Sequence, residues 1–557
     1  MSHLDTDILI VGAGGAGMYA AIAAARAGAE RVLLADKSLV GRGGATIMAQ
    51  MTVAAALAEE CADDWQAHLV DTLAAGRGLC DETLAAALCH DAPVRIREME
   101  QWRVGWARRD DGRIAQVTAP GHSVPRCCYV DFLNTGPAVA ATLRKQIGRI
   151  DRIRRVSNLT VTDLVTADGE AVGAVALDAA SGEPVTVAAK AVIIAAGGLT
   201  RIYRRNSASA NMGGDGYALA LAAGADLVDM EFVQFFPIGH LAPRLVGMDP
   251  IMWDPFRYKL GGRLLDGQGR EFLADYGSDE TDAYTTPRDI ATYAIEKEVA
   301  AGRGSPHGGV YLSFAHLPRE ALQAAFGPVI ERLAKNGIDL GRIPVEVAPI
   351  AHYHMGGVAV DERMASRVPG LYAAGEAAGG ANGANRLSGN AIPEALVFGE
   401  RAGRFAAEFA ATRSAGWNPH RAVPAVERIR ELGEGRRGDV AAATLLDELR
   451  EIMGNDVGPF RSAAGLDRAL ARIADLKSAL PDVAIAPQRA SNPTLADWFE
   501  LRASLTAAET VARAALARQE SRGAHQREDF PQTDPAWVRR QHATMASDGS
   551  IALGLAS

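Results

Sequence analysis

A glycine-rich segment near the start, Gly12-Ala-Gly-Gly-Ala-Gly17, constrains the fold more than any other part of the chain. It follows a short apolar run that is typical of a buried parallel strand, and it opens an alanine-rich helix. Gly12 allows a tight turn, Gly14 lets the backbone approach a pyrophosphate, and Gly17 lets helix and strand pack closely. The helix start presents free N–H groups to phosphates. The segment therefore predicts a Rossmann-like unit that binds a dinucleotide.

An acidic residue after the next strand supports this interpretation. The expected strand 31–35 ends at Asp36, about 20 residues beyond the glycines, where a carboxylate can accept hydrogen bonds from an adenosine ribose. A glycine-rich loop without a ligand is the alternative. The combination of strand, helix and Asp36 favours the dinucleotide site.

A second glycine-rich segment, 383–394, separates a flavin from a plain nicotinamide cofactor. An expected strand, 368–374, precedes it, and Pro393 is expected at the first position of a helix with one buried face. The positive end of that helix suits the anionic N1–C2=O edge of a reduced isoalloxazine. The chain thus returns to the cofactor, as a long flavin across a sheet requires.

Composition agrees with a large soluble enzyme. The chain has 557 residues, 48% of them hydrophobic, and no apolar stretch long enough to span a membrane. Its net charge of −9 and the absence of a long basic run argue against nucleic acid. We expect a cytoplasmic protein without a signal peptide, associated with a membrane only through a partner.

The cysteines have neither metal-site nor iron–sulfur spacing, so no metal is expected in this chain. We expect them to be small buried residues in a reducing compartment, without a redox role. They are Cys61, Cys80, Cys89, Cys127 and Cys128.

Taken together, the motifs resemble those of one family. The segments 12–21, 211–225, 351–358, 370–403 and 520–531 look like the flavoprotein subunit of the succinate dehydrogenase and fumarate reductase family, which includes L-aspartate oxidase. The resemblance covers nearly the whole chain, in family order. It implies an α/β fold: a Rossmann-like FAD-binding domain, an inserted α+β capping domain and a C-terminal helical domain.

Shifts in composition place the expected domain boundaries. The FAD-binding domain would comprise residues 1–237 and 351–415, with the capping domain at 238–350 and the helical domain at 416–557. Aromatic, proline and basic residues cluster in the capping block. The last block has helix-period apolar spacing, with Asn492-Pro493 as a helix cap and first position.

The resemblance also assigns catalytic roles. Arg288 occupies the position of an arginine that donates or accepts the substrate proton, relayed through a carboxylate such as Asp254 or Asp289. His352 and Arg386 match positions that hold a substrate carboxylate over the flavin. Two of these residues have a structural alternative. Arg288 could belong to a surface Arg-Asp pair at a helix start, and His352 could be a core histidine bonded to the backbone.

Residues expected to contact FAD come from several segments. Glu376 resembles the acid that binds the ribityl chain, and Asp215 resembles a further anchor, although both could be turn residues. The full expected set is Gly12, Gly14, Gly15, Gly17, Asp36, Lys37, Gly44, Thr46, Gln50, Ala196, Gly197, Asp215, Glu376, Arg386, Asn390, Ala391 and Ile392.

Two departures from the family pattern concern the substrate. Where succinate and fumarate enzymes show Gln-Phe-His-Pro-Thr, this chain has Gln234-Phe235-Phe236-Pro237-Ile238. A carboxylate facing Phe236 and Ile238 would be poorly solvated, at a cost of several kcal/mol if unpaired. The segment 253–259 adds aromatic bulk and lacks a family glutamate. We therefore expect an aromatic or otherwise apolar carboxylate, or a thioester.

A third departure concerns flavin attachment. Covalently linked members carry a histidine where this chain has Ala45, and no histidine lies between His3 and His68. We expect non-covalent FAD. The resemblance implies that covalent attachment raises the flavin potential, so its absence favours a reductase over a succinate-type dehydrogenase.

These observations favour an FAD-dependent oxidoreductase that acts on a C–C bond beside a carboxyl or thioester group, with hydride exchange at flavin N5 and proton transfer by Arg288. Two alternatives remain: an L-aspartate-oxidase-like amino-acid oxidase, against which Phe236 weighs, and a flavin electron-relay subunit. The resemblance of the helical block implies an iron–sulfur electron-transfer partner.

Overall fold

The chain forms two compact units in a computed structural model. The structure describes residues 2–131, 133–246, 248, 251–253, 260–276, 288–414 and 416–555, and only the backbone of 288 and 289. The larger unit holds residues 1–204, 208–233 and 353–557, and the smaller unit holds 205–207 and 234–352.

A mainly parallel sheet forms the centre of the larger unit. Over the described residues it has seven strands in the order β6-β2-β1-β9-β8-β7, with β16 beside β9. The parallel strands are β1 (Ser2–Val11), β2 (Val32–Ala35), β6 (Ile153–Val156), β9 (Glu183–Ile194) and β16 (Leu371–Ala373). The hairpin of β7 (Leu159–Ala167) and β8 (Glu170–Asp178) extends the sheet antiparallel. This topology confirms the predicted Rossmann-like fold.

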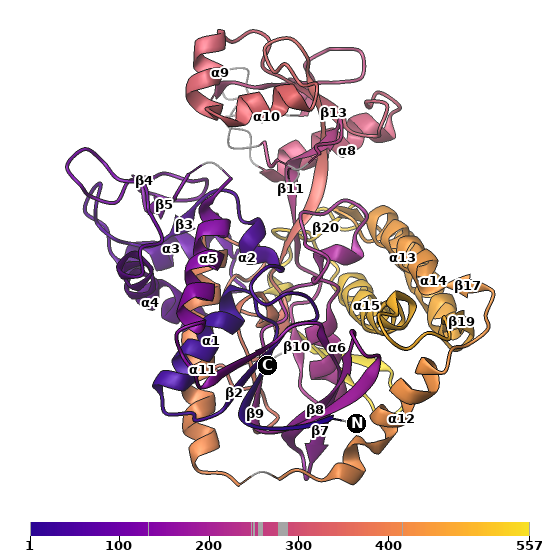
Figure 1. Cartoon of the computed structure of the whole chain (residues 1–557). Helices are drawn as coiled ribbons and strands as arrows, with labels where there is room; N and C mark the ends of the chain where they lie inside the picture. Colours follow the sequence, from indigo (N-terminus) through magenta and orange to yellow (C-terminus); the bar gives the residue numbers. More distant parts are fainter. Residues whose placement is uncertain are drawn as a thin grey trace. The chain divides into compact units, whose positions relative to one another are not determined.

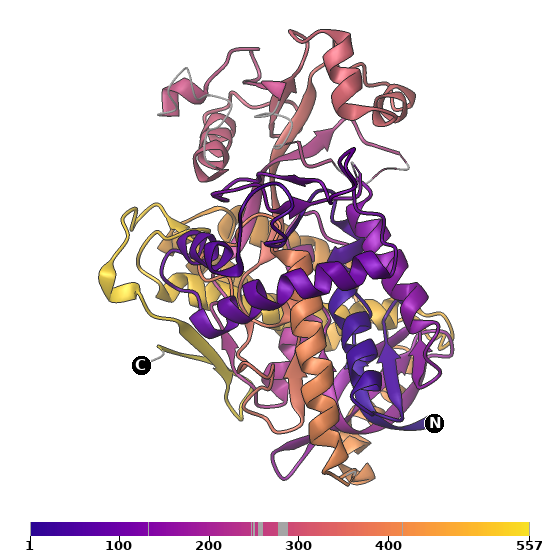
Figure 2. The same cartoon turned by 90° about the vertical axis from the view of Figure 1, so that its left-hand side faces the viewer.

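Two helices pack closely against each other beside this sheet (Figures 1 and 2). They are α1 (Gly15–Arg26) and α11 (Ala391–Ala411). A Cβ added at Gly399 would lie 2.6 Å from the oxygen of Ala16, and one at Gly403 would lie 2.2 Å from the oxygen of Ala20. Glycines one helical turn apart on α11 therefore let the two backbones approach. The helix begins at Ala391, so Pro393 is its third residue and not its first.

The insertion after β2 adds further helices and a small sheet to the larger unit. The helices are α2 (Ala45–Met48), α3 (Trp65–Ala75), α4 (Glu82–Gln101) and α5 (Thr135–Ile147). The small sheet has the order β3-β5-β4, with β3 at Val53–Ala54, β4 at Gln116–Val117 and β5 at Cys127–Cys128. Both residues of β5 are fully buried, as is Cys89, which confirms the expectation for these three cysteines, whereas Cys61 and Cys80 are partly exposed.

The C-terminal block is helical, as predicted. Its helices are α12 (Pro419–Gly433), α13 (Ala442–Asp456), α14 (Ala463–Ala479) and α15 (Pro493–Ala517). The predicted cap is confirmed, since the Asn492 side chain accepts from the N–H groups of Thr494 and Leu495. Ser504 of α15 donates to the oxygen of Gly213, just before α6 (Asp215–Ala222). These helices thus belong to the same compact unit as the parallel sheet, and the boundary at 416 stays a prediction.

The smaller unit has α+β structure. Its sheet has the order β11-β14-β13-β12 and is accompanied by helices in the part of the unit that the structure describes. The strands are β11 (Val233–Ala242), β12 (Arg263–Leu265), β13 (Val310–Ser313) and β14 (Val345–His354), and the helices are α8 (Arg288–Ala300), α9 (Arg319–Phe326) and α10 (Val329–Lys335). Trp253 is fully buried in its core, packed against Phe314 and Phe326.

Candidate functional site

One edge of the parallel sheet gathers the predicted cofactor residues. Register pairs Val11 with both Ala35 and Ile194, and Ile194 with Ala373. Four parallel strands therefore end in one row, and the residues that follow each of them lie along the same edge. In open α/β sheets, ligands bind outside the carboxyl ends of the strands.

The glycine turn after β1 has the predicted geometry. Gly12 has a φ of +103°, and a Cβ there would lie 2.4 Å from the oxygen of Ala195. A Cβ at Gly17 would lie 1.9 Å from the oxygen of Gly12, so α1 could not start this close to β1 with any other residue. Gly14 is different, because the nearest atom to a Cβ there is the Thr46 hydroxyl at 4.0 Å. Space thus remains beside Gly14, as backbone approach to a pyrophosphate requires.

Two side-chain hydroxyls bond the main chain at and next to this turn. The N–H of Gly15 donates to Thr46 Oγ1 at 3.0 Å, and the N–H of Gly44 donates to Ser209 Oγ at 2.8 Å. Gly44 has a φ of +82°, which explains glycine at this position. Ser209, which the sequence did not single out, lies in an irregular segment without periodicity.

Asp36 is buried and hydrogen-bonded within the protein. Its Oδ2 accepts from the N–H of Ala13 at 2.8 Å, and its Oδ1 accepts from the N–H of Ser38 at 2.8 Å and from Asn211 Nδ2 at 3.0 Å. The carboxylate therefore fixes the glycine turn, and a ribose would share it with these donors. Asn211 is a second residue that sequence reasoning missed.

Lys37 joins this edge to the C-terminal helices. Its Nζ lies 2.7 Å from Asp215 Oδ2 and 3.8 Å from Glu500 Oε2 of α15. Burial disfavours the charge, but the two carboxylates outweigh it and raise the pKa of Lys37. Asp215 is the first residue of α6, where the helix dipole also stabilises its charge.

The start of α11 presents main-chain donors. Among the described residues, no acceptor is bonded to the N–H of Gly389 or Ala391. The Asn390 side chain is fully buried, with Oδ1 2.9 Å from His68 Nε2 and Nδ2 donating to Thr72 Oγ1 at 3.2 Å. The contribution of Asn390 to cofactor binding is therefore limited to its main chain.

Glu376 follows β16 at the sheet edge. Its Oε1 accepts from the N–H of His354 at 3.0 Å. Although the residue is partly exposed, protein atoms crowd its carboxylate, and this burial raises the pKa of Glu376 to about 8. A neutral or readily protonated carboxyl can both donate to and accept from hydroxyl groups, as a ribityl chain requires.

Arg386 lies over an aromatic ring. Its guanidinium carbon is 4.4 Å from the centroid of the Tyr353 ring, and its Nη1 donates to the oxygen of Leu387 at 3.3 Å. The Tyr353 hydroxyl donates to Glu394, whose pKa burial raises to about 7. The guanidinium is thus held in place by stacking and retains its charge in a buried setting.

Partial exposure is the feature that tests whether a flavin nucleotide fits here. The expected contact residues come from distant segments. Several of them are partly exposed, although the strands that lead to them are buried. This exposure is consistent with a ligand that covers them. They are Gly12, Gly14, Lys37, Gly44, Thr46, Ala196, Gly197, Asp215, Glu376 and Ala391. The residues present fit FAD, with Ala45 in place of a linking histidine.

In the smaller unit, His352 is fixed by two neighbours. Its Nδ1 lies 2.9 Å from Ser207 Oγ, and the main chain of Ser207 donates to the oxygen of Ala351 at 3.0 Å. The ring of Phe236 meets the imidazole edge to face, with centroids 5.5 Å apart. Phe236 is buried and clusters with Met252 and Ile350. Ser207 was not predicted, because a lone serine in an irregular segment carries no signal.

Other predicted residues have different outcomes. Asp254 and the side chains of Arg288 and Asp289 lie outside the described residues. Ile238 and Trp253 are fully buried in the smaller unit, so the expected aromatic bulk at position 253 belongs to its core.

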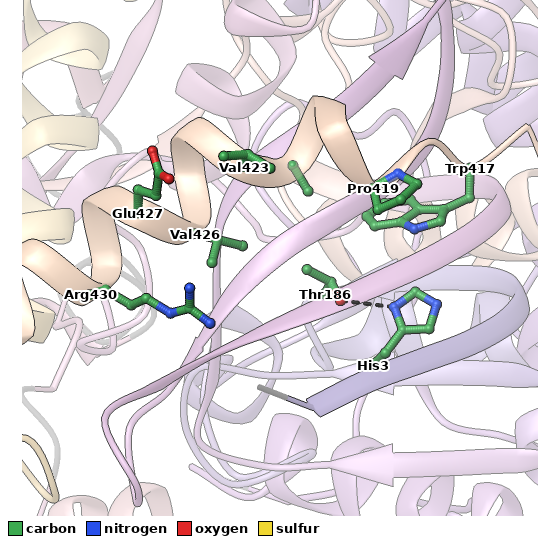
Figure 3. A pocket seen from close by; sticks show the side chains of 9 residues that line it. His3, Thr186, Trp417, Pro419, Val423, Val426, Glu427 and Arg430 are labelled. Carbon is green, nitrogen blue, oxygen red and sulfur yellow. Dashed lines mark hydrogen bonds between the residues drawn. The ribbon is translucent and has the colours of Figure 1, made fainter.

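A pocket elsewhere is not part of this site (Figure 3). It has a volume of about 520 Å³ and lies along α12, between Trp417, Val423 and Arg430, with His3 at one end. No predicted cofactor or catalytic residue lines it. Among the described helices, none has both the length and the apolar composition to cross a bilayer.

Comparison with known proteins identifies the class. Two family models match, one described as FAD binding domain over residues 7–392 and one as fumarate reductase flavoprotein C-term over 446–555. Together with the geometry of the sheet edge, these matches define the chain as an FAD-dependent oxidoreductase.

Individual relatives narrow the class to a family. One subunit of the fumarate reductase (CoM/CoB) of Methanothermobacter marburgensis is 37% identical over 96% of both chains. L-aspartate oxidase of Caulobacter vibrioides is 35% identical over 95% of this chain and 94% of the relative. A solved quinol-fumarate reductase chain, 33% identical, superposes with a TM-score of 0.92 over 100% of this chain and 98% of that chain. The chain belongs to the succinate dehydrogenase and fumarate reductase flavoprotein family.

Proposed function

We propose that this chain reduces or desaturates a carbon–carbon bond beside a carboxyl or thioester group, in a substrate more apolar than succinate or fumarate. The edge-to-face contact of Phe236 with His352 carries the proposal. If His352 binds one substrate carboxylate, a second carboxylate nearby would meet a buried phenyl ring. An unpaired charge in that position costs several kcal/mol, whereas an alkyl or aryl group would pack favourably.

The side chains divide the work as the family pattern implies. When bound, FAD supplies a hydride donor or acceptor at its N5 atom. His352 and Arg386 bind the substrate carboxylate. The Ser207 hydroxyl bonds Nδ1 of His352, so that the other ring nitrogen, Nε2, is the one that faces the carboxylate. Arg288, at the start of α8, moves the proton to or from the neighbouring carbon. Asp254 is the carboxylate through which that proton is relayed.

Restoring the family imidazole tests the substrate class. In the Phe236→His variant, a hydrogen-bonding ring replaces the phenyl group, so fumarate reduction should rise at least tenfold over the unmodified enzyme, about 1.4 kcal/mol of transition-state stabilisation. The matched control is Phe235→His, the same substitution one residue earlier on the opposite face of β11. The control should gain no fumarate activity. Unmodified enzyme that already reduces fumarate as well as Phe236→His does would contradict the proposal.

An electron-transfer partner is part of the proposal. The C-terminal match covers residues 446–555, and the Methanothermobacter marburgensis relative is named as one subunit of a fumarate reductase. These observations support an iron–sulfur protein as the partner that exchanges electrons with the flavin.

A further inference from the structure

Two buried histidines that the proposed function does not use lie next to the start of α11. His68, in α3, is fully buried, and His122, in the loop before β5, is nearly so. Their ring centroids are 6.0 Å apart. We refer to His68 and His122 as the imidazole pair. Each contacts a different residue of the tripeptide 388–390, immediately before α11.

The contacts of His122 fix its protonation. Its Nε2 lies 2.6 Å from the oxygen of Ser388, which can only accept, so Nε2 carries the hydrogen. Its Nδ1 lies 3.2 Å from Arg126 Nη1, which can only donate. The ring is therefore neutral, with both nitrogens engaged. Burial also lowers the pKa of His122.

Arg126 is itself held rigidly. Its Nη2 lies 3.0 Å from Asp63 Oδ1, and its Nη1 also bonds Asp71. Asp71 accepts in addition from the N–H and the hydroxyl of Ser123, both at 2.8 Å. The guanidinium therefore holds His122 in one orientation, and a second proton on that ring would face a fixed positive charge.

His68 holds the third residue of the tripeptide. The Thr72 hydroxyl donates to the oxygen of His68 and accepts from the amide nitrogen of Asn390. This orientation leaves Asn390 Oδ1 as an acceptor facing the ring, so Nε2 of His68 is the donor of that bond. Burial lowers the pKa of His68 to about 3, so this ring is also neutral.

The middle residue, Gly389, is enclosed between these two contacts. It has a φ of +88°, and its oxygen accepts from the N–H of Ala54 at 3.0 Å. A Cβ there would lie 3.1 Å from Ala54 and 3.2 Å from Cys127 Sγ. Each residue of 388–390 thus has its own fixed partner, while the N–H groups of Gly389 and Ala391 have no bonded acceptor among the described residues.

We propose that the imidazole pair consists of positioning residues that aim these main-chain N–H groups at the flavin and thereby set its reduction potential. The hydrogen bond from His122 also polarises the peptide group between Ser388 and Gly389, which makes the Gly389 N–H a stronger donor. Donors fixed in advance favour the form of the flavin that carries negative charge, which is the reduced form. This inference rests on FAD lying at the start of α11, as in the proposed function, but not on any substrate.

Redox titration of the holoenzyme with reference dyes tests the proposal without substrate. His122→Leu and His68→Leu should each shift the flavin midpoint potential downward by about 30 mV, equal to a tenfold loss in the ratio of reduced to oxidised flavin at a fixed potential. Glutamine places an N–H donor where histidine has Nε2, so His122→Gln and His68→Gln should stay close to the unmodified enzyme. His90→Leu, at an exposed histidine of α4, is the control and should not shift.

Two results would overturn the proposal. One is an unchanged potential in both leucine variants, even with weaker FAD binding or lower thermal stability, since a purely structural role changes only those quantities. The other is a glutamine variant that shifts as far as its leucine counterpart. If the leucine variants do not fold, His122→Asn replaces them, because its shorter amide cannot reach the Ser388 oxygen and the same downward shift is expected. Loss of the proposed substrate preference in other experiments would leave these titrations unaffected.

Discussion

The two glycines of the first turn should respond oppositely to the same substitution. At Gly14, φ is −71° and an added Cβ has no neighbour within 4.0 Å apart from the Thr46 hydroxyl at that distance, so Gly14→Ala fits the protein. Because alanine has less conformational freedom than glycine in the unfolded chain, the free energy of unfolding of the FAD-free protein should stay unchanged or rise by about 0.4–1 kcal/mol. The new methyl group occupies the space a pyrophosphate needs, so FAD affinity should fall at least tenfold, about 1.4 kcal/mol.

Gly17→Ala has the opposite expectation. Its Cβ would lie 1.9 Å from the oxygen of Gly12, so helix and strand must separate, at a cost of about 3 kcal/mol or more in the free energy of unfolding. FAD binding followed by flavin fluorescence, and thermal unfolding of the FAD-free proteins, separate the two effects. Unchanged FAD affinity in Gly14→Ala would refute the placement of the pyrophosphate at this turn.

Two further predictions concern the flavin and Glu376. Because Ala45 replaces the linking histidine, acid precipitation should leave the yellow colour in the supernatant, and colour in the pellet would contradict non-covalent binding. Burial raises the pKa of Glu376 from about 4.5 to about 8. Between these pH values the folded protein holds a proton that the unfolded chain has released. The free energy of unfolding of the FAD-free protein should therefore fall as the pH rises through this range. Glu376→Gln should flatten this fall in thermal midpoint between about pH 5 and 8; parallel profiles for the two proteins would show that another group is responsible.

Much of the fold could be predicted because its signals are local. The strand, glycine turn and helix at the N-terminus, the capped helix after Asn492 and the long helix α11 all follow from short-range patterns. The change in composition after residue 237 predicts a separate block, and the domain boundaries drawn from it stay predictions. The exact start of α11 was not, because Pro393 is compatible with more than one position in a first helical turn.

The candidate site was predicted less completely, since several of its contacts join distant segments. Ser207, Ser209 and Asn211 lie in one irregular stretch, where single polar residues have no period to mark them. The burial of Trp253 in the core of the smaller unit could not be predicted, because a pattern of aromatic residues does not say which face of a unit they occupy. The inward-facing side chain of Asn390 likewise depends on His68, more than 300 residues away in sequence.

The central claim is that this flavoprotein acts on an apolar carboxylate or thioester. Its most direct test is stopped-flow re-oxidation of the reduced, anaerobic enzyme by an aryl-substituted enoate and, separately, by fumarate. We predict that the aryl enoate re-oxidises the flavin at least ten times faster than fumarate at equal concentration, about 1.4 kcal/mol. Re-oxidation by fumarate at an equal or greater rate would contradict the claim.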